Sequence, residues 1–364
     1  MFEFSWVYLA IAFAGGVAGA AYGALPMFCL CGLSAIIGAV ITLVTGDTTF
    51  TSWVTWGPIL GPQVSFAGGA AAAAYAARMG KLDSGRNIGA ALMGLNAPDV
   101  LLVGGLFGML GALINWLLWS IPFIGERPWT NTIALTVVVV AVISRILFGR
   151  TGVFGNVPRG ASRWAPAEGS GWLPWQSKPA QLVLIGVGVG LPAAHLTKLL
   201  SETLSETTFF QKTILSMPNP AGGSLADPTF LLFGFTVIAL TFLLFNTKIP
   251  VTHHIALSAE FVTVATGDVG WGLAFGVLAA FLGELYAVLF ISYGDTHIDP
   301  PSAALATTFT IQSVLAATGV LDLAGAAPLV IAAVIAVVGY GIFAALQKQP
   351  AGADASLQVQ VETE

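Results

Sequence analysis

Long apolar runs recur along this chain from one end to the other, and almost no charge interrupts them. Residues 132–148, "TIALTVVVVAVISRILF", are one example. About 20 predominantly apolar residues are enough for a helix to cross the hydrocarbon core of a bilayer. Only 9% of the 364 residues are charged, whereas soluble domains carry about 25%. The sequence therefore predicts an all-α polytopic membrane protein, embedded in the lipid bilayer of the cell (inner or plasma) membrane.

Hydropathy and helix-breaking residues divide the chain into about eleven predicted transmembrane helices. They cover residues 5–23, 26–45, 62–78, 99–123, 131–149, 179–198, 229–247, 250–267, 270–292, 302–319 and 325–346. The apolar part of the intervening stretch 79–98 is too short to cross a bilayer. We therefore expect a re-entrant or an interfacial segment there.

The distribution of Lys and Arg predicts the orientation of these helices. With the N-terminus outside, only Arg127, Lys198 and Lys212 fall on the outer side, and the other ten of the 13 Lys and Arg residues fall on the inner side. Short cytoplasmic loops are enriched in positive charge. We therefore expect an N-out, C-in topology.

The two halves of the predicted bundle resemble each other in sequence. Three matches occur in the same order: 105–135 with 272–305, Pro62 and Ser65 with Pro250 and His253, and Pro26 with Pro192. Five helices per unit is an odd number, so a second unit enters the membrane from the opposite face. The sequence thus predicts a 5+5 inverted repeat plus one extra C-terminal helix, an architecture typical of transporters.

This interpretation divides the chain into five parts. They are a first membrane repeat at 1–149, a cytoplasmic linker at 150–178, a second membrane repeat at 179–319 that contains a polar outer loop at 199–228, an extra transmembrane helix at 320–346, and a polar cytoplasmic tail at 347–364.

The stretch "PVTHHIALSAEF", residues 250–261, places ionisable groups inside a predicted membrane helix. His253 and Glu260 are seven residues apart, so they share one helix face, about 10 Å apart along the axis. His254 points toward the neighbouring face. Glu284 follows on the next, antiparallel helix at a similar predicted depth. Ionisable residues inside a membrane are costly and usually functional, so we expect Glu260 and Glu284 to bind a proton or a cation.

Two further groups of polar residues are candidate site residues. Gln63 and Ser65 follow the helix-breaking sequence "WGPILGP" and align with the histidines of the second half. Asp295, His297 and Asp299 form a polar turn before Pro300. That turn predicts a cytoplasmic gate, a metal-binding turn, or an ordinary helix start in which Asp299 is the N-cap.

These features favour a secondary transporter of a small solute, coupled to protons or Na⁺. A passive channel of the same architecture is the main alternative, and a metal-dependent intramembrane enzyme is a weaker one because no HExxH-type spacing is present. We expect no enzyme activity, no cofactor and no bound metal. The scattered basic residues argue against nucleic-acid binding, and homo-oligomerisation is left open. Without a buried Arg or Lys cluster, a cation or a neutral solute is favoured over an anion.

Overall fold

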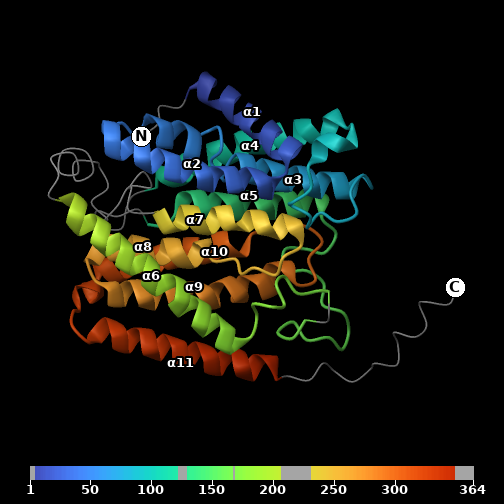
Figure 1. The fold of residues 1–364 in the computed structure, drawn as a ribbon. Helices are drawn as coiled ribbons and strands as arrows, with labels where there is room; N and C mark the ends of the chain where they lie inside the picture. Colours follow the sequence, from blue (N-terminus) through green and yellow to red (C-terminus); the bar gives the residue numbers. More distant parts are fainter. Residues whose placement is uncertain (1–4, 122–128, 167–168, 206–230, 349–364) are drawn as a thin grey trace.

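The computed structural model describes residues 5–121, 129–166, 169–205 and 231–348. Within these ranges the regular structure is helical and contains no strand, apart from one isolated bridge between Gly85 and Thr296. Most of the helices lie side by side in one elongated bundle, with α1 on one edge, α11 on the opposite edge, and α6 crossing obliquely (Figure 1). The chain is therefore an all-helical protein in its described part.

The first half of the chain forms five α-helices and two short helical turns. These are α1 (Trp6–Tyr22), α2 (Ala24–Thr45), η1 (Thr51–Thr55), α3 (Ser65–Arg78), η2 (Leu92–Leu95), α4 (Pro98–Trp119) and α5 (Thr132–Phe148). Ser5 and Asn131 begin α1 and α5 with side-chain caps, and Gly46 ends α2 in a left-handed conformation with φ 77°, the usual glycine helix stop.

The second half forms six α-helices. The elements are α6 (Pro179–Ser205), α7 (Leu231–Ala239), η4 (Leu240–Phe245), α8 (His253–Thr266), α9 (Val269–Tyr286), η5 (Ala287–Ile291), α10 (Pro300–Ala317), η6 (Val320–Asp322) and α11 (Ala327–Gln347). The side chains of Asp268 and Asp299 cap α9 and α10.

Among the described residues, five segments are long and apolar enough to cross a membrane: α2, α4, α6, α9 with η5, and α11. Shorter apolar helices are α1, α5, and α7 with η4. These lengths support the prediction of a helical membrane protein. In contrast, α3 and α8 are each only 14 residues long.

Both short helices begin later than the sequence predicts. Residues 56–64 form turns before α3, and residues 246–252 are non-helical before α8. Pro58 and Pro62, spaced by Gly57 and Gly61, break the first segment because proline lacks an N–H and glycine disfavours helix. The predicted re-entrant or interfacial stretch 79–98 is a loop in which η2 packs against α1. Residues 206–228 of the predicted outer loop and 349–364 of the tail lie outside the described residues, and 199–205 continue α6.

Close contacts between glycines hold the helices of each half together. In the first half, α1 packs against α3 and α4, with Gly16 against Gly104 and Gly108. In the second half, α6 packs against α8 and α9, with Gly190 against Gly276. The halves meet where α2 packs on α7 and α5 packs on α10, and α11 covers α6 and α9. Such small-residue contacts let membrane helices approach closely.

One end of the bundle, here the loop end, collects the loops that carry most of the Lys and Arg residues. Hydrogen bonds tie these loops together: Arg86 to Gly171, Arg145 to Thr296, Trp175 to Ile249 and Gln347 to Ser177. The segments 79–91, 150–178, 246–252 and 292–299 therefore lie on the same side of the protein.

Candidate functional site

A cavity of about 360 Å³ extends from the loop end toward the middle of the bundle, and we call it the vestibule. Its lining comes from both halves and from the linker: Leu25, Phe28, Phe66, Ser84, Arg86, Asn87, Ile88, Trp172, Leu173, Leu240, Leu243, Val251, His253, Ile291, His297, Asp299 and Pro301. Ser84 and Asn87 are exposed, so the vestibule reaches the surface beside them. Its volume lies within the range of small-molecule sites.

The buried part of the vestibule carries three ionisable side chains. His253, His297 and Asp299 are 4%, 5% and 8% exposed. His297 Nε2 lies 3.1 Å from Asp299 Oδ1, and Asp299 Oδ2 accepts hydrogen bonds from the N–H and the hydroxyl of Ser302. Burial opposes ionisation of Asp299, but the hydrogen bond and charge of His297 outweigh it, so the pKa of this carboxyl is lowered. The vestibule thus ends at a hydrogen-bonded acid beside two histidines.

A second, smaller cavity of about 30 Å³ lies next to the vestibule, and we call it the central pocket. Its lining residues are Phe28, Trp56, Pro62, Asn131, Ile133, Ala134, Val137, Phe233, His253, Leu257, Ser302 and Leu305. Both cavities share Phe28 and His253, whose ring centroids lie 5.0 Å apart. These two rings therefore stand between the vestibule and the central pocket.

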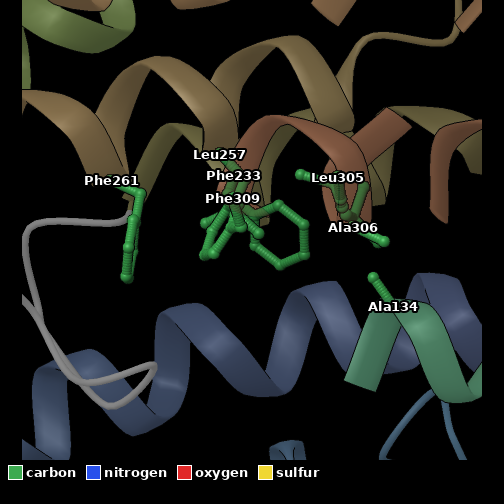
Figure 2. Packing of buried hydrophobic residues seen from close by; sticks show 8 residues of the cluster. Ala134, Phe233, Leu257, Phe261, Leu305, Ala306 and Phe309 are labelled. Atoms are coloured by element: carbon green, nitrogen blue, oxygen red, sulfur yellow. The ribbon is translucent and has the colours of Figure 1, made fainter. Parts of the chain in front are cut away.

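An apolar cluster lies along the central pocket on the side away from the vestibule, and we call it the closing cluster. It consists of Ala134, Phe233, Val237, Leu257, Phe261, Leu305, Ala306 and Phe309, all buried. Figure 2 shows the labelled side chains of α8 and α10 directed into one space, with Ala134 of α5 facing them. The rings of Phe261 and Phe309 stack with centroids 4.1 Å apart. This cluster fills the space between the two halves beyond the central pocket.

Among the predicted site residues, the structure places His253 at both cavities and His254 at neither. His254 is 1% exposed and packs against Gly283 of α9. Gln63 and Ser65 are fully buried. The Gln63 side chain donates to the carbonyl of Trp56, and the Ser65 hydroxyl donates to the carbonyl of Leu60. Both therefore bind backbone groups that the break before α3 leaves outside a helix.

Glu260 is fully buried on α8, and its carboxylate does not line either cavity. Its Oε1 accepts a hydrogen bond from the backbone N–H of Phe233 at 3.1 Å, in the first turn of α7. A carboxylate is favourable at a helix N-terminus because the first N–H groups carry partial positive charge. Glu260 therefore ties α7 to α8, next to the ring of Phe233 in the central pocket.

The pairing of α8 with α9 sets the depth of Glu284. Gly272 packs against Thr263, and Gly283 packs against His254. Glu284 therefore lies level with the first turn of α8, about eight residues or about 12 Å from the level of Glu260. The sequence predicted that the depths of the two acids differ by less than one helical turn. The difference arises because the turn at residues 267–268 fixes the register of the two helices.

The turn before α10 separates its three polar residues. Asp299 is the N-cap of α10, as an ordinary helix start predicts, and it lines the vestibule together with His297. Asp295 instead accepts hydrogen bonds from the backbone N–H of Arg150 and the hydroxyl of Thr151. In the described part of the chain, no three His, Cys, Asp or Glu residues are grouped so that they can hold a metal ion.

Arg145 holds together the loops around the vestibule. It is not among the site residues predicted from the sequence. It is 1% exposed on α5 and donates to the carbonyls of Val153, Phe290 and Thr296 and to the hydroxyl of Thr296. A single arginine inside an apolar run is the signal that identifies it, because buried membrane charges need partners. Arg145 thus joins the first half, the linker and the loop that carries His297.

Comparison with known proteins adds one finding. The model of a protein family described as "Family of unknown function (DUF7973)" matches residues 2–168 and 223–330, which together make up more than half of the chain. The chain belongs to this family. All residues that line the central pocket lie within the matched ranges, whereas most of α11 lies beyond them. No curated protein and no solved structure matches the chain.

Proposed function

We propose that this protein is a secondary transporter that carries a small solute between its two halves. The observation that supports this most directly is that the three features are continuous. The vestibule and the central pocket share Phe28 and His253, and the central pocket shares four lining residues with the closing cluster: Ala134, Phe233, Leu257 and Leu305. In this proposal the vestibule admits the solute at the loop end, the central pocket binds it, and the closing cluster blocks the far side. Movement of the halves then exposes the central pocket to the opposite side.

The short helices α3 and α8 support this function. Transporters commonly bind their solute at interrupted helices in corresponding positions of two repeats. Here, both helices have 14 residues, both follow an irregular segment, and both contribute to the cavities. Soluble-protein packing gives no reason for such a matched pair.

We propose a 5+5 inverted repeat with α11 as the extra helix, making eleven membrane helices. The contacts of α1 with α3 and α4 parallel those of α6 with α8 and α9, which supports two equivalent units. One of the three sequence matches does not fit this correspondence, because Pro26 lies at the start of α2 whereas Pro192 lies inside α6. The gathering of basic loops at the loop end supports a cytoplasmic location for that end, and thus the N-out, C-in orientation.

Coupling to a proton is the further part of this proposal. The buried titratable groups on the passage are Asp299, His297 and His253, which come together where the vestibule ends, whereas Arg86 lines the vestibule and is half-buried. We assign the coupling site to these residues. Glu260 and Glu284 lie outside the cavity linings, and we assign Glu260 the role of holding the start of α7.

Cysteine accessibility tests the transport cycle without knowledge of the solute. Cys29 and Cys31 are replaced by alanine, and a single cysteine is introduced at Asn87 in the vestibule mouth or at Leu305, the member of the closing cluster that lines the central pocket. A membrane-impermeant thiol reagent is then added to either face of oriented membranes. We expect the cysteine at 87 to react from one face only and the cysteine at 305 to react from both. A cysteine at the buried, non-lining Val277 is the unreactive control.

Labelling of position 305 from neither face, or only from the face that labels position 87, overturns alternating access. A passive channel is the alternative function. The response of solute uptake to an imposed driving force distinguishes it from a transporter. A proton-coupled transporter accumulates solute when a pH gradient is imposed on proteoliposomes, whereas a channel only equilibrates it.

A further inference from the structure

The start of α8 is buried but has no side-chain cap among the described residues. Its first two residues, His253 and His254, are 4% and 1% exposed. The first N–H groups of a helix have no partner within that helix, and a buried helix start normally finds one in a capping side chain, a water or a ligand. The N–H of Ile255 already donates to the carbonyl of Thr252, so the N–H groups of His253 and His254 are the backbone donors that a ligand can satisfy.

The side chain of His253 gives an independent indication of a ligand. It lines both the vestibule and the central pocket, and its Nδ1 has no hydrogen-bond partner in the described part of the chain. An unpaired buried ring nitrogen costs about 1–3 kcal/mol. A ligand in the central pocket removes that cost when it binds the ring.

Three other helices begin at the same pocket. Pro62 precedes α3, Asn131 is the N-cap of α5, and Ser302 lies in the first turn of α10. Each helix start carries about half a positive elementary charge. The α3 start has no described side-chain cap, although the N–H groups of Ser65 and Ala67 donate to the carbonyls of Gly61 and Pro62, and α5 has the neutral Asn131. Only α10 is capped by an acid, Asp299, and no described lining residue of the central pocket is acidic.

We infer that the central pocket binds a small monovalent anion, held by the start of α8 and the ring of His253. The pocket volume of about 30 Å³ is larger than the roughly 10–15 Å³ that one water molecule needs. That size suits a halide or a small planar oxyanion such as nitrate or formate, and excludes larger organic acids from the closed state. This inference rests on the proposed transport function and identifies its solute class.

The binding test uses purified protein in detergent at constant sodium concentration. The probes are chloride, nitrate and formate, with sulfate and gluconate as larger anions. We expect at least one small anion to raise the unfolding temperature in a saturable way, and the larger anions to have no effect. His253→Gln lowers the affinity for that anion at least tenfold. The matched control is His254→Gln, on the neighbouring face of the same turn, which keeps the affinity within about twofold.

A second variant keeps the proposal testable if His253→Gln does not fold. Asn131→Asp preserves the N-cap of α5, because Asp and Asn cap helices equally well, but adds a negative charge at the central pocket. We expect at least a tenfold loss of anion affinity. If Asn131→Asp strengthens binding of a cation, or if no small anion stabilises the wild-type protein, the anion assignment is wrong.

Flux measurements separate this inference from the proposed function. Anion binding in detergent without anion movement in proteoliposomes leaves the binding site intact and overturns transport. Position 305 labelled from both faces without any anion binding leaves transport intact and overturns the anion site.

Discussion

Arg145 offers the sharpest test of how the vestibule is held together. Arg145→Lys keeps the positive charge but replaces a planar fork with one ammonium group, which cannot reach acceptors in several directions. Three carbonyl acceptors and one hydroxyl, spread over the linker, η5 and the loop before α10, depend on the guanidinium. Removing one partner of a buried charged group typically costs about 3–5 kcal/mol. We expect a loss of this size in the free energy of unfolding.

The assay is denaturant unfolding in mixed micelles, with Arg150→Lys as the matched control. Arg150 is exposed in the same region, and its backbone N–H, not its side chain, binds Asp295. The control should therefore stay within about 0.5 kcal/mol of the wild-type protein. If Arg145→Lys is destabilised by less than about 1 kcal/mol, or no more than the control, Arg145 does not organise this loop. We also expect faster thiol labelling of a vestibule cysteine in Arg145→Lys, because the loop loses its attachment.

Three further outcomes follow from the geometry. Gly111→Ala places a methyl group 1.8 Å from the carbonyl oxygen of Gln63, so it should lower the free energy of unfolding by about 1–3 kcal/mol or more. The control Gly188→Ala meets open space and should raise the free energy of unfolding by up to about 1 kcal/mol. Equal effects of the two variants in the same unfolding assay contradict the packing. Glu260→Gln keeps a hydrogen-bond acceptor for the first turn of α7 and should retain proton-driven flux. Glu260→Ala removes that acceptor and should lose about 1–3 kcal/mol of stability. Loss of flux in a well-folded Glu260→Gln protein would instead assign the coupling role to Glu260. The pKa of Asp299 is lowered in the folded state, so ionised Asp299 contributes to the stability of the fold above its ordinary pKa of 3.8, and this contribution disappears as the pH falls below that value. The melting temperature of Asp299→Asn should therefore depend less on pH below about 4 than that of the wild type.

The positions of the helices were largely predictable from the sequence. Apolar runs indicate helices directly, and Pro58 and Pro62 indicate the irregular start of α3. Two details depended on tertiary contacts. The register of α8 against α9 follows from glycine contacts such as Gly283 with His254, and hydropathy contains no such information. For that reason the predicted proximity of Glu260 and Glu284 was wrong, although each residue was correctly placed on its helix.

The lining of the cavities was less predictable than the helices. Phe28 and Phe66 stand at the vestibule with centroids 5.8 Å apart, yet they look like any other aromatic residue of an apolar run. A helix that is apolar on all sides gives no periodicity from which to choose its inner face. Polar residues gave better guidance, since His253, His297 and Asp299 were all selected from the sequence and all line the vestibule.

The sequence favours a cation or a neutral solute because it contains no buried Arg or Lys cluster. That reasoning considers side chains only and leaves out the charge of the backbone groups. Four helices start at the central pocket, and three of them, α3, α5 and α8, carry partial positive charge without an acidic cap. Such a site is suited to a membrane interior, because fixed dipoles attract an anion without the cost of burying an arginine or a lysine. Only the three-dimensional arrangement shows that the four starts converge, since they are separated by up to about 240 residues in the chain. In the anion inference, the sign of the solute charge follows from this arrangement of helix starts and not from composition, and Asn131→Asp tests it with one added charge.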